Sequence, residues 1–242
     1  MAATALNAEF TFEIPPVPVY LDIAGQPVAL TVSGNISGAS TKPGVSEQSF
    51  ALNLHGDLAD FQSHMTPLLQ AEMNQSHRCG ERVSIERATL VPASPAGRLT
   101  VQLHFEKWAC FKAFGKENAK RLLGGNGIVL VILTPRVEKG QTVRLDAEIG
   151  DIDADGSLGE VLRSEFVGAA MRDKICEALL KAIQRSADLE TVLPSAARPF
   201  VTIQSAAFAD AGSGRLALNL VGRLLVPESQ VSSVLEQFRD RR

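Results

Sequence analysis

One pattern of secondary structure occurs twice in this chain and constrains its fold more than any other feature. In each copy a strand is followed by an amphipathic helix and then by a β-hairpin whose second strand begins with Arg-Leu. The first copy has its strand at residues 50–56, its helix from about residue 58 and its hairpin strands at 83–85 and 98–103. The second copy has its strand at 143–149, a longer helix from residue 158 and its hairpin strands at 201–203 and 215–220. Alternating apolar residues give each strand one buried face, which a helix must then cover.

This repeat predicts an α+β fold in which antiparallel strands are covered by long amphipathic helices. Hydrophobic residues make up 45% of the 242 residues and charged residues 21%, so a sizeable core is possible. No low-complexity segment or obvious flexible linker divides the sequence, which favours a single domain spanning 1–242. Within it we expect the repeat at about 48–111 and 127–226, proline-punctuated edge strands at 8–37 and a C-terminal helix at 227–240.

The second predicted helix, from about residue 157 to residue 187, is long and has a broad apolar stripe. We predict that this stripe lines a ligand-binding groove between the helix and the sheet. The groove residues are Leu158, Val161, Leu162, Glu165, Ala169, Arg172, Leu179, Leu180 and Ile183. Glu165 and Arg172 lie two helical turns apart and would meet a polar head group; the alternative is that both lie at the edge of the stripe or pair with neighbouring strands. Cys176 falls on the stripe and is predicted to be a buried free thiol.

The first predicted helix is shorter, and we expect Asp57 or Asp60 to cap its start. Pro67 should kink this helix or restart it. Glu72 is a candidate to meet a polar head group from this helix, as Glu165 would from the longer one. The apolar side of this first helix consists of Leu58, Phe61, Met65, Leu68 and Leu69. Farther along the chain, the basic segment 112–123 is predicted to form a short helix that ends at two glycines.

Two of the three cysteines are placed to form a disulfide. Residues that face each other across a symmetric hairpin have a constant sum of residue numbers, and Cys79 and Cys110 centre on the turn at 92–97. They should therefore face each other at the open end of the hairpin, within reach of a disulfide. A disulfide favours an oxidising compartment, either a bacterial periplasm or the outside of the cell. The alternative is that the placement is fortuitous and both thiols are reduced.

Several function classes are disfavoured by composition and motifs. A net charge of −3, a pI near 5.9 and 5% aromatic residues are untypical of a nucleic-acid-binding protein. No segment reaches the roughly 18 to 20 apolar residues that span a bilayer. The first residues lack the basic start and apolar core of a signal peptide, so we expect either a mature periplasmic or secreted form or, alternatively, a cytoplasmic protein. No catalytic motif or cofactor fingerprint is present, so we predict neither an enzyme nor a cofactor.

The segment Asp151-Ile-Asp153-Ala-Asp155-Gly156 resembles the first half of a calcium-binding loop, because alternating carboxylates around a glycine can converge on one cation. Its twelfth position, however, is Leu162 instead of the required glutamate. The alternative is a polar turn between strand and helix, in which Asp155 or Ser157 caps the helix.

The strand, long helix and hairpin units resemble those of the tubular lipid-binding (TULIP) superfamily. Their Gly-Arg-Leu-x-Leu-x-Leu strands lie at 214–220 and, with Val101 in place of the middle leucine, at 97–103. The group includes the bactericidal permeability-increasing proteins and the synaptotagmin-like mitochondrial lipid-binding domains, and the likeness covers roughly residues 50–226. The resemblance implies a curved antiparallel sheet wrapped around long amphipathic helices, enclosing an apolar groove. We therefore predict a non-enzymatic binder or carrier of a lipid or other apolar ligand in the cell envelope. The alternative is an interaction or assembly protein whose helices fill the sheet and leave no cavity.

Overall fold

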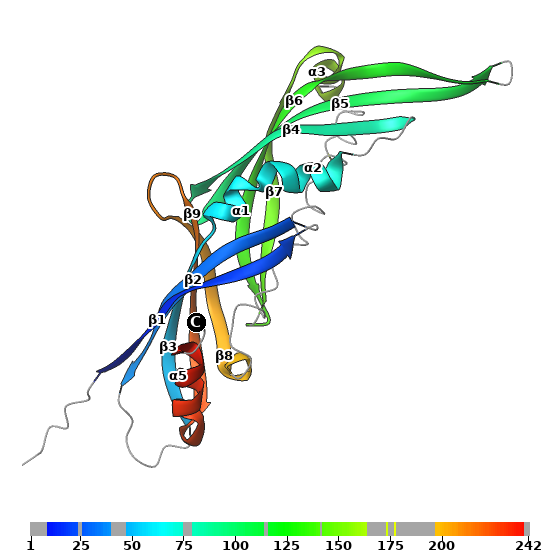
Figure 1. Cartoon of the computed structure of the whole chain (residues 1–242). Helices are drawn as coiled ribbons and strands as arrows, with labels where there is room; N and C mark the ends of the chain where they lie inside the picture. The colour runs from blue at the N-terminus through cyan, green and yellow to red at the C-terminus, as the bar shows by residue number, and fades with distance from the viewer. Residues whose placement is uncertain are drawn as a thin grey trace, which may run out of the picture.

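The computed structural model describes residues 9–23, 26–39, 47–74, 79–113, 116–140, 142–163, 173, 177 and 197–239. These residues form two open antiparallel sheets that follow each other along an elongated molecule (Figure 1). Sheet 1 has the strand order β1 (Glu9–Ile23), β2 (Gln26–Ala39), β3 (Glu47–Asp57), β9 (Leu216–Pro227) and β8 (Val201–Asp210). Sheet 2 has the order β4 (Gly80–Ala93), β5 (Ala96–Ala113), β6 (Lys116–Glu138) and β7 (Thr142–Ala154).

The helices are short, and this overturns the predicted fold class. They are α1 (Ala59–Ser63), α2 (Met65–Met73), α3 (Gly156–Arg163) and α5 (Val231–Arg239), so that none of these four exceeds nine residues. The prediction of a curved sheet wrapped around long amphipathic helices is therefore wrong for the described part of the chain, which is mostly antiparallel strand. The first helix restarts at His64, just before Pro67, because proline fits the first turn of a helix but not its interior. The basic segment predicted as a helix lies within β6, where pairing with β5 prevails over helix propensity.

The two copies of the repeat exchange partners. The first strand of copy one, β3, pairs with β9, which belongs to the hairpin of copy two. The first strand of copy two, β7, lies in the sheet that contains the hairpin of copy one, β4 and β5. The proline-containing strand β1 lies at an edge of sheet 1, whereas β2, which the sequence predicts to be an edge strand too, pairs with both β1 and β3. Each sheet therefore joins segments from both halves of the chain.

Two apolar clusters hold the sheets and helices together. One cluster lies between sheet 2 and helices α1 and α2, and it also contains Phe208 and Leu216 from sheet 1. The other lies between sheet 1 and α5, and it contains Val143 from β7. Since each cluster takes residues from both sheets, the sheets share their apolar interior.

Phe208 on β8 is a central contact between the sheets. Its side chain is only 1% exposed and lies against Gly97 of β5, where an added Cβ would come within 3.3 Å of the ring. Its backbone N–H donates to the carbonyl oxygen of Pro95 at 2.9 Å. Nearby, the N–H of Ile203 donates to the carbonyl oxygen of Gly140 at 2.7 Å. Strand β8 is thus attached to sheet 2 by both backbone and side chain.

A row of polar side chains on α1, on α2 and on the residue that follows α2 bonds to the outer edge of β4. We call this row the polar helix stripe; its members are four residues apart and are Gln62, Thr66, Gln70 and Asn74. The bonds are Gln62 Nε2 to Leu90 O (2.7 Å), Ala88 N to Thr66 Oγ1 (2.9 Å), Gln70 Nε2 to Ile85 O (2.9 Å) and Ile85 N to Asn74 Oδ1 (2.7 Å). Buried or partly buried backbone groups need such partners, so the stripe replaces a neighbouring strand.

Candidate functional site

Most of the predicted groove falls outside the part of the chain that the structure describes. Glu165, Ala169, Arg172, Leu179, Leu180 and Ile183 lie outside the described residues, as does Cys176. Val161 and Leu162 belong to α3, but their side chains lie outside the described part, and the same holds for the side chain of Glu72 in α2. Leu158 is described: its side chain is fully buried in the apolar cluster of sheet 2, and Gly125 of β6 lies against it. The one placed groove residue is therefore a core residue.

The predicted disulfide between Cys79 and Cys110 is present, with 5.6 Å between the Cα atoms. Near the turn, the residue numbers of two facing residues sum to 189, as for the pair Ala93 and Ala96. A bulge in β4 around Glu86 lowers this sum to 188, so that Gly80 faces Trp108 at the start of the strand. The cysteines are still close enough to bond, and the disulfide attaches the segment before β4 to β5. It is consistent with an oxidising compartment.

The three aspartates of the calcium hypothesis lie at the end of β7 and in the turn that leads to α3. Asp155 anchors this turn, because its Oδ1 accepts the N–H of Asn126 at 2.7 Å and its carbonyl oxygen accepts the N–H of Gly159 at 2.9 Å. The hydroxyl of Ser157 bonds to both the N–H and the carbonyl oxygen of Gly124. Within the described ranges no three His, Cys, Asp or Glu residues are grouped so that they could hold a metal ion. The contacts of Asp155 and Ser157 are those of a polar turn.

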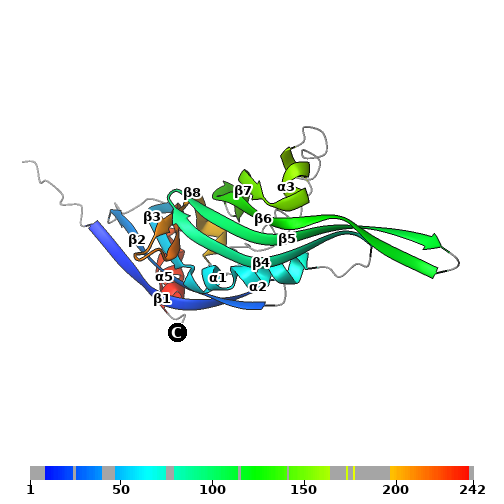
Figure 2. The ribbon, with the colours of Figure 1, turned by 90° about the horizontal axis from the view of Figure 1, so that it is seen from above.

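A two-stranded extension of sheet 2 projects from the rest of the described structure. Pairing of β4 with β5 begins at Gly80 and Trp108, and β7 leaves β6 at Gly127. Beyond these points, β5 and β6 continue to pair with each other as far as Ala113 and Lys116. We call residues 107–113 and 116–123 the β5–β6 arm; Lys107 and Trp108 at its start still pair with β4, and the arm projects past the rest of sheet 2 in Figures 1 and 2.

A charged cluster at the root of the arm centres on Glu106. Its carboxylate accepts the indole N–H of Trp108 at 2.8 Å and a guanidinium N–H of Arg121 at 3.0 Å. The ring of His104 lies 3.6 Å from it, and Arg82 stacks over Trp108 at 4.9 Å. The hydrogen bond from Trp108, followed by that from Arg121, lowers the pKa of Glu106 below its usual range. These contacts tie β4, β5 and β6 together where the arm leaves the sheet.

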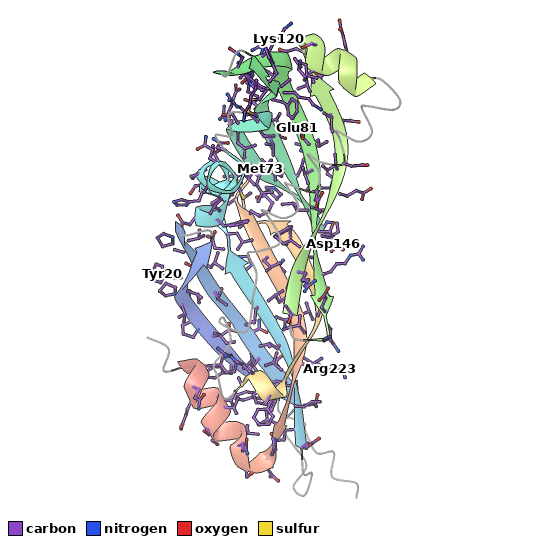
Figure 3. All side chains as sticks on the ribbon, turned by 90° about the vertical axis from the view of Figure 1, so that its right-hand side faces the viewer. Tyr20, Met73, Glu81, Lys120, Asp146 and Arg223 are labelled. Atoms are coloured by element: carbon purple, nitrogen blue, oxygen red, sulfur yellow. A yellow bond between two sulfur atoms is a disulfide. The ribbon has the colours of Figure 1, made fainter. Side chains whose placement is uncertain are left out.

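The arm as a whole is basic and partly apolar. Phe111 is 51% exposed and Leu122 is 57% exposed, and Lys112 and Lys120 are also exposed. Leu122 is the extra residue of a bulge, since Trp108 faces Arg121 while the preceding residue in β5 faces Leu123. Figure 3 shows Lys120 at the end of the molecule opposite α5.

The charge of the arm opposes that of the remaining chain. Residues 107–123 contain five lysines and arginines and one acidic residue, a formal charge of +4. Subtracting this value from the −3 of the whole chain leaves −7 for all other residues. The sequence shows this basic segment directly. Its position on a projecting ribbon could not be predicted, because the residue pattern favours a helix there. A run of cations with interspersed large apolar residues is the signal that could have found it.

No family model, no curated protein and no solved structure matches this chain. None of the described helices is long and apolar enough to cross a bilayer.

Proposed function

We propose that this protein acts by binding and not by catalysis, and that the β5–β6 arm is its contact surface for an anionic partner. This is the interaction protein that the sequence left as the alternative to a lipid carrier. The observation that carries the proposal is the arm itself, in which exposed cations and apolar side chains extend away from an acidic body. The disulfide between Cys79 and Cys110 supports a place of action in an oxidising compartment.

The charge distribution supports contact through the arm first. A partner of uniform negative charge attracts the arm and repels the remaining −7, so the molecule would approach with the arm in front. The net charge of −3 alone would suggest weak repulsion. Because dissolved salt screens charges that lie more than about 10 Å apart, the exposed Lys112 and Lys120 govern the contact. Lys107 and Arg121 contribute less, because they pair with Glu81 and Glu106.

A salt-resolved binding measurement on an immobilised polyanion such as heparin tests this proposal. Neutralising two arm cations in the variant Lys112→Gln/Lys120→Gln should lower the salt concentration needed for elution, because fewer counterions are released on binding. The control variant Arg87→Gln/Arg98→Gln removes the same charge from exposed positions of β4 and β5 outside the arm. It should elute close to the wild type. Equal elution of both variants, or no retention of the wild type at low salt, contradicts contact through the arm.

Carriage of a lipid between the longest predicted helix and the sheet is a separate prediction, and Leu158 is the one groove side chain that the structure describes. Its complete burial in the core shows the start of this helix packed against the sheet. Native mass spectrometry with analysis of an organic extract tests the carrier. Lipid recovered in near-stoichiometric amount supports it, whereas a clean protein mass with no uptake of a fluorescent fatty acid rejects it.

A further inference from the structure

We infer that the partner of the β5–β6 arm is the surface of an anionic phospholipid bilayer; this inference rests on the proposed function. The arm combines the two kinds of side chain that an interface of this type binds. Lysines and arginines are attracted by the negative surface potential, and large apolar side chains enter the boundary between head groups and acyl chains. Phe111 and Leu122 supply the apolar part, and each exposes more than half of its surface.

The register of the arm places its cations on both faces. Phe111 faces Asn118 and Ala109 faces Lys120, so these four side chains share one face of the ribbon. Trp108 faces Arg121, and Lys112 lies four residues farther along β5 than Trp108, so these three side chains share the other face. With cations on both faces, neither face of the ribbon is without a charge that a negative surface attracts.

The apolar part distinguishes a bilayer from other polyanions. Binding to a phosphate backbone needs cations and gains little from an exposed leucine, because sequence-independent affinity there is electrostatic. Phe111 and Leu122 belong to the same ribbon as exposed cations, so one surface of the protein can make both a charged and an apolar contact. The presence of both exposed apolar side chains and exposed lysines on the arm therefore favours an interface that is charged outside and apolar within.

The acidic remainder of the chain would fix the orientation of binding. With −7 outside the arm, the rest of the molecule is repelled by a negative bilayer and stays away from it. The disulfide adds to this, because it ties Cys110 in the arm to Cys79 beside β4 and so connects the arm to the sheet. A bound molecule would thus stand on its arm, with α5 at the far end (Figure 3).

Flotation of the full chain with vesicles tests the inference. One vesicle preparation is phosphatidylcholine alone, and the other contains one third phosphatidylglycerol. The wild type should float with the anionic vesicles and not with the neutral ones. The variant Lys112→Gln/Lys120→Gln should bind the anionic vesicles roughly tenfold to thirtyfold more weakly, since each cation near such a surface contributes about fivefold.

The apolar contribution is tested with the variant Phe111→Ser/Leu122→Ser, which should weaken vesicle binding roughly tenfold or more. The matched control is Val221→Ser/Leu225→Ser, because these side chains of β9 are also exposed, at 43% and 47%, but lie outside the arm. The control should float like the wild type.

The outcomes separate the two proposals. If the wild type binds heparin through the arm but does not float with the anionic vesicles, the bilayer inference is overturned and the proposed function stands. If it floats and the arm variants float equally well, the bilayer inference is likewise overturned. If neither heparin nor vesicles bind through the arm, both proposals fall. Loss of vesicle binding in Phe111→Ser/Leu122→Ser with unchanged heparin elution supports both, and a circular dichroism spectrum equal to that of the wild type shows that this variant is folded.

Discussion

Replacing Phe208 by alanine should destabilise the whole protein, because this side chain joins the two sheets. Its ring belongs to β8 of sheet 1 yet lies in the apolar cluster of sheet 2, with only 1% of its surface exposed. Burial of such a ring contributes about 1.5–3 kcal/mol, and the cavity left by its removal brings the total cost to about 3–5 kcal/mol. This is a large part of the about 5–15 kcal/mol by which a typical domain is stable.

Urea denaturation followed by two signals measures this cost. The single tryptophan, Trp108, lies in sheet 2, and far-ultraviolet circular dichroism reports the strands of both sheets. In the wild type the two signals should change at the same urea concentration, since the sheets share their core. In Phe208→Ala both midpoints should move together to lower urea without a change of slope.

The matched control is Phe111→Ala, which makes the same chemical change at a side chain that is 51% exposed. Its effect should lie within about 0.5 kcal/mol of zero. If Phe208→Ala costs less than about 1 kcal/mol, or no more than the control, the packing of β8 against sheet 2 is refuted. Separate midpoints in the wild type would show instead that the sheets unfold independently.

Three further changes test other parts of the structure. Replacing both Cys79 and Cys110 by alanine should lower the unfolding free energy by about 3–4 kcal/mol, because the disulfide closes a loop with a sequence separation of 31; thiol titration of the denatured, unreduced wild type should give one thiol, and three would contradict the bond. The lowered pKa of Glu106 stabilises the fold above the pKa of an unfolded glutamate, and this stabilisation is lost as the pH falls through the lower folded pKa. Glu106→Gln should therefore flatten the acid-side fall of the melting temperature, and an unchanged profile would show that the carboxylate is not held as described. Val101→Asp should prevent stable folding because Val101 is fully buried, whereas Leu218→Asp, at a partly buried position, should cost less; equal urea midpoints would contradict this difference.

The features that sequence reasoning predicted well are local ones. Strands β3, β7, β8 and β9 follow from alternating apolar residues, which depend only on a period of two. The bond between Cys79 and Cys110 follows from the symmetry of one hairpin, and a bulge of one residue did not displace it beyond reach. Both inferences use residues that are near each other along the chain.

The pairing of distant strands could not be predicted in the same way. Strand β3 pairs with β9, so that Leu54 faces Leu220, and no local pattern chooses this partner over the nearer hairpin strands. The segment from Lys116 to Leu123 contains good helix formers, and only its partner β5 makes it a strand. The basic charge of the arm could therefore be seen in the sequence, but its strand structure could not be predicted.

The polar helix stripe was also missed, although its signal is present in the sequence. Polar residues at every fourth position from Gln62 to Asn74 lie beside the apolar side of the same helices. Such a row is usually taken as a solvated face. Here it bonds to backbone groups of β4, and Gln62 also reaches the turn before β9 by donating to the carbonyl oxygen of Gly214 at 2.8 Å.

That row bears on how a chain so rich in β-structure avoids aggregation. Fibrils grow when the exposed border of one sheet recruits a strand from another molecule. Along β4 this recruitment is blocked, because amide and hydroxyl groups of the helices already occupy the backbone positions that an incoming strand would need. The helices thus protect this edge, and an insertion or deletion that shifts their register by a single residue would expose its backbone groups as a template for polymerisation.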